Sequence, residues 1–425
     1  MEQTNFKKTI IIFVSIHVFI FLVLLPLLAH FFYGGSGGLE AYIARLILPP
    51  DWQIPYHDFA SEYPPLALLS FLLPGLVTTA TVPYAWLFAT ELMIFDLLVL
   101  FMLADLASRL KISPKNTLII YTLVIVAVGP ILIARYDLLP AMLVMAAIWA
   151  FIKGKNKLAW AAAALGFAAK LYPIIIVPFF FIYQMKNRQY SRIIKGGAVF
   201  LITLLVVFLP WIIIDAGGFW HSFTYHFERG LHSESTYGTA LLAGQVLGLT
   251  HVDGALTFGS WNLSSPLADR LANLSFPISA GVMLIIYGLF IWRLRKDRSG
   301  NATTTLPSPS AAVLLQYAAL AVTAFLVTNK VFSAQYMAWL CPLIPLATGG
   351  KQYVVPVVFM LAAVMTQYVY PYIYIGFELA EPLPVFILFF RNLLLILMAI
   401  AIGLAYRNKN SLYQMPGTNA LRPGG

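Results

Sequence analysis

Residues 158–184 read LAWAAAALGFAAKLYPIIIVPFFFIYQ, and this stretch decides the fold class of the chain. It carries a single charged residue, Lys170, and basic clusters flank it on both sides. Lys and Arg mark the cytoplasmic side of membrane helices, so a stretch with two basic ends must enter the bilayer and return. The sequence therefore predicts two short helices, 158–169 and 171–184, with Lys170 at their apex. Non-helical backbone within a bilayer survives only beside protein or water, so this pair should border a water-filled cavity.

The composition of the whole chain supports a membrane protein. Of 425 residues, 60% are hydrophobic and only 10% are charged, whereas soluble domains carry about 25% charged residues. The net charge of +10 comes from short Lys and Arg clusters between apolar runs, which favours an anionic lipid surface over a nucleic acid as the partner. The lone cysteine, Cys341, excludes an intramolecular disulfide and is typical of a small core residue.

The charge rule also predicts a topology for the remaining helices. It gives an all-α bundle of about 12 crossings in the cell membrane, as one domain over 1–406, with both termini cytoplasmic and a disordered tail at 407–425. Extracytoplasmic loops are expected at 32–65 and 215–270, and the short run 66–77 is interpreted as re-entrant or interfacial. Besides the 158–184 pair, the expected helices are 9–31, 84–107, 116–134, 138–152, 194–214, 272–292, 308–328, 334–348, 354–371 and 384–406.

Acidic residues and histidines concentrate on the predicted outer side, although only Lys and Arg were used to assign it. Five of the seven histidines lie there: 57, 221, 226, 232 and 251. So do 12 of the 17 acidic residues: Glu40, Asp51, Asp58, Glu62, Asp137, Asp215, Glu228, Glu234, Asp253, Asp269, Glu378 and Glu381. A protein that only needed anchoring would not require this, so we expect an outward-facing polar site.

The first outer loop carries the candidates for a general base. Asp58 and Glu62 follow the first helix, close to the lipid surface, where an ionised carboxylate can deprotonate an acceptor hydroxyl. His57 is either a further polar contact or part of a metal site, so a divalent cation is one candidate cofactor. The alternative for these residues is a solvated loop without a catalytic role.

Candidate anion-binding residues lie in the other outer turns. Lys170 suits a phosphate, or else extends to the outer headgroups. Arg135 and Asp137 are either functional or an ion pair that closes a turn. In YHFERGLHSES, His226, Arg229 and Glu234 are either ligand contacts or a solvated ion-pair network. Lys330 and Gln335 occupy a later outer turn, where Lys330 goes against the charge bias.

Several short motifs resemble those of bacterial C-type membrane glycosyltransferases, especially the family 87 mannosyltransferases that use polyprenyl-phosphate mannose. The first is Y-x-D-F-x-x-E-Y-P-P-L at 56–66. The others are RYDLLPA at 135–141, GFAAKLYP at 166–173, RGLHSES at 229–235 and NKVFSAQYMAWLCPL at 329–343. The resemblance covers about 1–405.

The resemblance implies an inverting transferase that takes a sugar from a polyprenyl-phosphate donor and passes it to a glycan, lipid or protein acceptor on the extracytoplasmic face. By the match of motifs, Asp58 would be the catalytic base. Lys170, Arg229 and Lys330 would then be the candidates for contact with the donor phosphate, chosen by their charge and position. The sugar would be mannose or another hexose or pentose. The chain lacks the Asp-x-Asp of some relatives, which leaves metal dependence open.

Two other functions fit the same sequence features. Short broken helices are also typical of secondary transporters and flippases, although no internal symmetry is visible here. An O-antigen-type polymerase or ligase would share the long outer loop and the basic residues, and would use two lipid-linked substrates. No Walker A motif, GxSxG or CxxC is present, so the energy for a reaction must come with the substrate.

Overall fold

The computed structural model describes residues 2–33, 38–43, 53–296, 305–306, 308–348 and 353–405. The predicted tail 407–425 lies outside this part, as do residues 34–37 and 44–52 of the first predicted outer loop, Asp51 among them. Within the described part, seven helices are long and apolar enough to cross a membrane, and four shorter apolar helices accompany them. The predicted all-α polytopic membrane bundle is confirmed.

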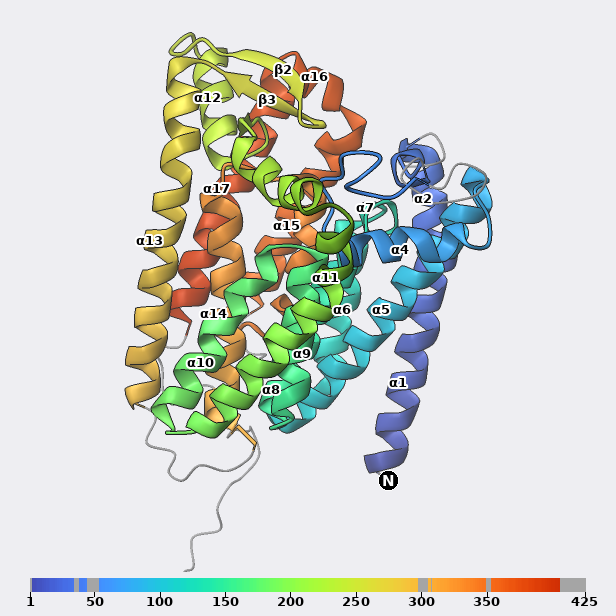
Figure 1. Ribbon diagram of the computed structural model, residues 1–425, viewed down its shortest axis with the longest axis vertical. Helices are drawn as coiled ribbons and strands as arrows, with labels where there is room; N and C mark the ends of the chain where they lie inside the picture. Colours follow the sequence, from blue (N-terminus) through green and yellow to red (C-terminus); the bar gives the residue numbers. More distant parts are fainter. Residues whose placement is uncertain are drawn as a thin grey trace, which may run out of the picture.

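The first half of the chain alternates long and short helices (Figure 1). It begins with an almost continuous helix of three parts, in which a π-helical turn interrupts the regular hydrogen bonding: α1 (Glu2–Phe19), η1 (Ile20–Leu24) and α2 (Leu25–Tyr33). It continues with α3 (Glu40–Ile43), α4 (Pro65–Gly75), α5 (Thr81–Arg109), α6 (Pro114–Val128), α7 (Ile131–Ala134), α8 (Leu138–Ile152), α9 (Asn156–Ala169), the 3-10 turn η2 (Tyr172–Ile176) and α10 (Val177–Lys186).

The second half adds the longest helices and a small sheet. Its elements are α11 (Tyr190–Glu228), β1 (Leu231–His232), α12 (Thr236–Val246), β2 (Asp253–Thr257), β3 (Ser260–Ser264), α13 (Pro266–Lys296), α14 (Ser308–Thr328), η3 (Ala334–Trp339), η4 (Ile344–Leu346), α15 (Val354–Gln367), η5 (Tyr368–Tyr372), α16 (Tyr374–Glu378) and α17 (Pro382–Leu404). The strands are antiparallel in the order β1-β3-β2, with Leu231 opposite Leu263 and Gly254 opposite Leu263 on its other side.

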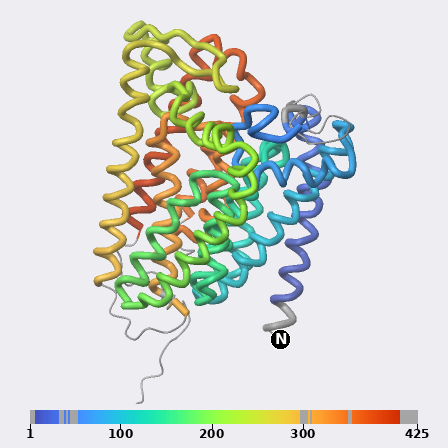
Figure 2. The backbone as a smooth tube through the Cα atoms, viewed as in Figure 1, coloured from blue at the N-terminus to red at the C-terminus, as the bar shows by residue number. Residues whose placement is uncertain are grey.

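The ends of several helices meet at the end of the bundle that carries the N-terminus, which we call the N-terminal end (Figure 2). Lys153, just after α8, pairs with Asp105 near the end of α5 at 3.0 Å. Lys186 at the end of α10 donates to the carbonyl of Leu294 near the end of α13. The sheet, α12 and α16 lie at the opposite end, which we call the far end (Figure 1).

Differences in helix length set the depth of the turns between the short helices. The helices α6 and α8 have 15 residues each and α9 has 14, so each spans about 21–23 Å. Around them, α5 has 29 residues, α11 has 39 and α13 has 31. The connections between the short helices therefore lie below the far-end tips of the long ones. The turn at Lys170 is one of these connections, as predicted from 158–184.

The predicted helices 334–348 and 116–134 are both interrupted. The segment 334–348 was expected to be one helix, but it forms the 3-10 turns η3 and η4. Pro342 and Pro345 lack the backbone N–H groups that a continuous α-helix needs there. The predicted helix 116–134 ends at Val128, because Gly129 adopts a positive φ of 69° and Pro130 follows it.

The predicted loop 215–270 is largely ordered secondary structure. The helix α11 continues to Glu228 across a break at Asp215, which has φ −154° and ψ 100°. The predicted end of this helix, residue 214, therefore coincides with the break. Beyond it, Asp215 Oδ1 accepts from the Gly218 N–H at 2.9 Å and caps the second part of the helix.

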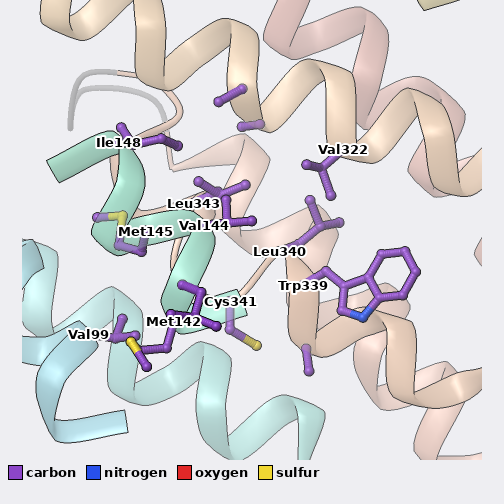
Figure 3. Packing of buried hydrophobic residues seen from close by; sticks show 14 of the residues in the cluster. Val99, Met142, Val144, Met145, Ile148, Val322, Trp339, Leu340, Cys341 and Leu343 are labelled. Carbon is purple, nitrogen blue, oxygen red and sulfur yellow. The ribbon is translucent and has the colours of Figure 1, made fainter. Parts of the chain in front are cut away.

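The core of the bundle packs the irregular segment 339–343 against α8 (Figure 3). Leu340, Cys341 and Leu343 have no solvent exposure, and they lie among α8 side chains such as Met142 and Val144. This packing fixes the position of Trp339 beside Asp137.

Candidate active site

Asp137 and Lys170 meet where two short helices have their far ends. Asp137 directly precedes α8, and Lys170 directly follows α9. Lys170 Nζ donates to Asp137 Oδ1 at 2.5 Å, and the indole N–H of Trp339 donates to the same oxygen at 2.6 Å. The Asp137 side chain is 2% exposed, whereas Lys170 retains 16%. Asp137 Oδ2 has no hydrogen-bond partner in the described part of the chain, so the pair is only half satisfied.

Aromatic rings surround the Lys170 ammonium. Its Nζ lies 4.8 Å from the ring centre of Tyr136, 4.9 Å from that of Tyr336 and 5.3 Å from that of Trp339. Tyr336 and Tyr172 both stack on Trp339, at 4.1 and 3.9 Å. Rings hold a cation by its charge and accept few of its hydrogen bonds. Two N–H groups of Lys170 thus remain for a ligand, because Asp137 takes only one of the three.

Arg229 reaches the same place from the end of α11. Its guanidinium lies within hydrogen-bonding reach of the Tyr336 hydroxyl, and it donates to Ser260 Oγ at 2.6 Å. The half-buried Tyr336 therefore contacts Lys170 with its ring and Arg229 with its hydroxyl. Arg229 Nε is buried and makes no hydrogen bond within the described residues.

Lys330 supports the backbone that carries Arg229. Its Nζ donates to the carbonyl of Phe227 at 2.8 Å and to that of Arg229 at 2.5 Å. These carbonyls end α11 and have no partners inside the helix. Burial, and then the positive charge of Arg229, lower the pKa of Lys330. At least two of its three N–H groups are thus directed at the main chain.

The loop that precedes α4 packs between α11 and Tyr136. A Cβ atom at Gly218 would lie 1.8 Å from the carbonyl oxygen of Tyr56, so only glycine permits this approach. The Tyr56 hydroxyl donates to the Tyr63 carbonyl at 2.6 Å, and the Tyr63 ring meets the Tyr136 ring edge-on at 5.7 Å. The loop is thereby tied to the residues around Lys170.

Asp58 lies on the accessible side of this loop. Its Oδ2 accepts the Ile54 N–H at 2.7 Å, and its Oδ1 lies 3.3 Å from His57 Nδ1. The side chains of His57 and Asp58 are 56% and 37% exposed. Glu62 follows on the same loop, and the ring of His226 on α11 lies within hydrogen-bonding reach of its backbone. The structure therefore brings Glu62 and His226 together.

Arg135 and Gln335 occupy the margins of the cluster. Arg135 donates to the Ala134 carbonyl at 2.7 Å and to the Tyr370 hydroxyl at 3.3 Å. It also lies close enough to Lys170 for its positive charge to act on it. Gln335 is half-buried in η3, next to Tyr336.

His232 on β1 and Glu234 just after it are both buried. Tyr374 donates to Glu234 Oε1 at 3.3 Å, and Glu234 Oε2 has no partner within the described residues. Burial raises the pKa of Glu234 to about 7 and lowers the pKa of His232 to about 3. A neutral His232 donates through Nδ1 to the Phe332 carbonyl at 2.8 Å. The two side chains are 4.0 Å apart, too far for a hydrogen bond.

The family model for glycosyltransferase family 87 matches residues 62–315, more than half of the chain. The chain belongs to this family. It is a membrane glycosyltransferase, and its substrates are a sugar donor and an acceptor. None of the curated proteins compared matches it.

The matched range of this family 87 glycosyltransferase includes most of the cluster. Asp137, Lys170 and Arg229 lie inside it, while Asp58 and Lys330 lie outside. No group of three His, Cys, Asp or Glu side chains within the described residues has the arrangement of a metal site.

Sequence reasoning missed the rings of Tyr172, Tyr336 and Trp339 as part of the site. With 62 aromatic residues in the chain, their number offered no signal. The occurrence of Tyr336 and Trp339 in NKVFSAQYMAWLCPL was the available clue. Sequence reasoning also missed Arg391 on α17, which donates to the backbone carbonyl of Glu234.

Proposed function

We propose that this family 87 glycosyltransferase transfers a sugar from a polyprenyl-phosphate donor to an acceptor hydroxyl on the extracytoplasmic face, with inversion at the anomeric carbon. The observation that supports this most directly is the junction of Lys170 and Arg229 on Tyr336. Two cations from distant elements converge there, and each keeps N–H donors that the described residues do not use.

Two further cations, Arg135 and Arg229, act on Lys170 besides its acidic partner Asp137. Cations that gather away from water are costly, so such a cluster favours a bound anion such as a phosphate. Fixed cations would also stabilise the negative charge that develops on the phosphate as the sugar leaves.

Asp58 is the proposed base. An acceptor hydroxyl would attack the anomeric carbon while the bond from that carbon to the phosphate oxygen breaks. The hydroxyl proton would pass to Asp58, and the polyprenyl phosphate would leave with the bonding electron pair. No further reactant is needed. The exposure of Asp58, together with its bond to the Ile54 N–H, leaves Oδ1 facing His57 and solvent, where an acceptor can approach.

The arrangement of the helices suits a lipid-linked donor. Lys170 lies at the far end of the short apolar helix α9, so a polyprenyl chain could stay in the bilayer while its phosphate reaches Lys170. The basic connections after α5, α8 and α10 gather at the N-terminal end, which supports a cytoplasmic position for that end in the cell membrane. The far end would then be extracytoplasmic.

The test is Asp58→Asn in the purified protein, assayed with a panel of polyprenyl-phosphate sugars that includes mannose, other hexoses and pentoses. We expect transfer to fall by about 10²–10⁴-fold, the usual contribution of a general base. Asp253→Asn is a matched control, because Asp253 also pairs with an exposed histidine, His251, at 3.8 Å. Normal turnover in Asp58→Asn would overturn the catalytic assignment.

The choice of acceptor in this assay also separates the alternative functions. A polymerase or ligase would use a second lipid-linked glycan as its acceptor. Movement of the lipid-linked sugar across liposomes without sugar transfer would instead indicate a flippase.

A further inference from the structure

Arg391 is a fully buried charge in the middle of α17. It is the tenth residue of this 23-residue apolar helix, and its side chain has no solvent exposure. A charge at such depth is costly and is usually retained for a function. None of the contacts around Asp58 or Lys170 involves Arg391, so its role must be sought in what it touches.

Arg391 and its neighbour Asn392 bind one backbone carbonyl in the segment 229–235. Arg391 Nη2 donates to the Glu234 carbonyl at 3.0 Å, and Asn392 Nδ2 donates to the same oxygen at 3.1 Å. Asn392 also donates to Thr239 Oγ1 at 2.9 Å, in the first turns of α12. These contacts hold the end of the segment that begins with Arg229.

Arg391 also contacts the segment 329–333, which pairs with 229–235. Its guanidinium lies 4.1 Å from the centre of the Phe332 ring. The backbone N–H of His232 donates to the Lys330 carbonyl at 3.0 Å, and the His232 ring donates to the Phe332 carbonyl. Lys330 in turn binds the Arg229 carbonyl. The Arg391 guanidinium therefore contacts both of these paired segments, 229–235 and 329–333. We call the two segments together the clamp, and Arg229 is its first residue.

We propose that Arg391 is a positioning residue, which holds segment 229–235 against 329–333 so that the Arg229 guanidinium faces the site of the donor phosphate. This inference rests on the proposed function, in which Arg229 contacts that phosphate. A planar guanidinium is suited to the task, because it stacks on Phe332 while it donates to Glu234 and to Thr366 Oγ1 at 3.5 Å. Lysine can replace the charge but not this geometry.

Hydrogen exchange of the full chain in detergent tests whether Arg391 holds the segment. We expect the amides of 230–235 to exchange about tenfold faster or more in Arg391→Met, with an intermediate rate in Arg391→Lys. Gln316→Met is the matched control. Buried Gln316 on α14 donates to the carbonyl of Ile402 at 2.6 Å, and Ile402 lies on α17 about three turns beyond Arg391. If Arg391→Met exchanges like the control, the clamp is refuted. If Arg391→Met does not fold, Asn392→Leu removes the second donor from the same carbonyl and should show the same change.

Binding of decaprenyl monophosphate tests whether the clamp acts through Arg229. We expect binding about tenfold weaker in Arg391→Met and unchanged in Gln316→Met. The double variant Arg229→Met/Arg391→Met should bind no more weakly than Arg229→Met alone, because both changes remove the same contact. Additive losses would show that Arg391 does not act through Arg229.

The two proposals fail in different ways. Unchanged phosphate binding in Arg229→Met would overturn the phosphate site, and with it the purpose assigned to Arg391. Hydrogen exchange, which involves no ligand, would still decide whether Arg391 holds segment 229–235.

Discussion

Two of the buried ion pairs among the described residues, His17–Asp96 and Lys170–Asp137, differ in how fully their hydrogen bonds are used. The side chains of His17 and Asp96 have no solvent exposure, and that of Asp137 is 2% exposed. The first pair joins α1 to α5, whereas the second joins the far ends of the consecutive helices α8 and α9. Only the second pair is surrounded by further cations and by unused donors and acceptors.

The pair of His17 and Asp96 is saturated. Asp96 accepts from His17 Nδ1 at 2.6 Å and from the Tyr121 hydroxyl at 2.8 Å, so each oxygen has a partner. The Thr122 hydroxyl lies 2.9 Å from His17 Nε2 and also donates to the Leu118 carbonyl at 2.9 Å. Both ring nitrogens of His17 thus have a partner. The network fastens α1, α5 and α6 together and leaves nothing for a ligand.

The pair of Lys170 and Asp137 is unsaturated. Two donors share Asp137 Oδ1 while Oδ2 has none, and the Lys170 ammonium lies against rings rather than acceptors. Buried polar groups in proteins are usually satisfied, so unsatisfied ones point to a missing partner. The comparison teaches that a saturated pair is structural and that an unsaturated pair among further cations is a candidate site.

Breaking the saturated pair should have the largest effect, and on stability. Asp96→Asn removes the carboxylate of a fully buried pair, and removal of one partner from such a pair typically costs about 3–5 kcal/mol. We expect a lower thermal midpoint in detergent, with the donor KM of the folded protein unchanged. The double variant His17→Leu/Asp96→Leu should recover much of the loss, since apolar side chains replace both polar partners. A raised donor KM in Asp96→Asn would contradict the assignment of this pair as structural.

Changing the unsaturated pair should affect transfer more than stability. Lys170→Gln keeps a hydrogen bond to Asp137 but cannot neutralise a phosphate. We expect transfer to fall by about 10²–10³-fold, equivalent to about 2.7–4 kcal/mol, as for loss of a group that stabilises developing charge. Its thermal midpoint should lie above that of Asp96→Asn. The contrast between the two pairs would disappear if Lys170→Gln were unstable and transferred sugar at the normal rate.

Glu234 extends the comparison to pH. Burial raises its pKa from 4.5 to about 7, so the folded protein binds the proton more tightly than the unfolded chain. The stabilisation is complete below pH 4.5 and is lost as the pH rises through about 7, by up to about 3 kcal/mol at 1.36 kcal/mol per pKa unit. We therefore expect the stability of Glu234→Gln relative to the wild type to increase between pH 5 and pH 8.

The measurement is the thermal midpoint of both proteins between pH 5 and 8. Burial also lowers the pKa of His232, which makes stability rise with pH at low pH, opposite to the effect of Glu234. Both proteins contain His232, so comparing them at the same pH removes its contribution. Parallel curves for Glu234→Gln and the wild type would show that Glu234 does not titrate as its burial requires.

Much of the fold was predictable from residues alone. The expected helices 138–152 and 308–328 match α8 and α14, and the expected turn at Lys170 separates α9 from η2. The segment 334–348 was predicted wrongly, because its apolar composition outweighed Pro342 and Pro345. Hydropathy measures transfer into the bilayer, whereas the hydrogen bonding of a helix depends on individual residues.

The candidate site was predictable only in part. The sequence identified Lys170 and Arg229 as unusual charges, but it could not show that Tyr336 joins them or that Trp339 bonds Asp137, 202 positions earlier in the chain. It gave no sign of Arg391, because one arginine in an apolar helix has no partner that can be read from its neighbours.

By itself, the sequence determined that this chain is a multi-pass membrane protein in which two short helical segments meet at Lys170. These features follow from local hydropathy and from the distribution of Lys and Arg, which add up along the chain. Only the tertiary structure decided which charges are saturated and which are left for a substrate. That distinction depends on donors and acceptors within about 3 Å, and these are supplied by segments that the sequence separates.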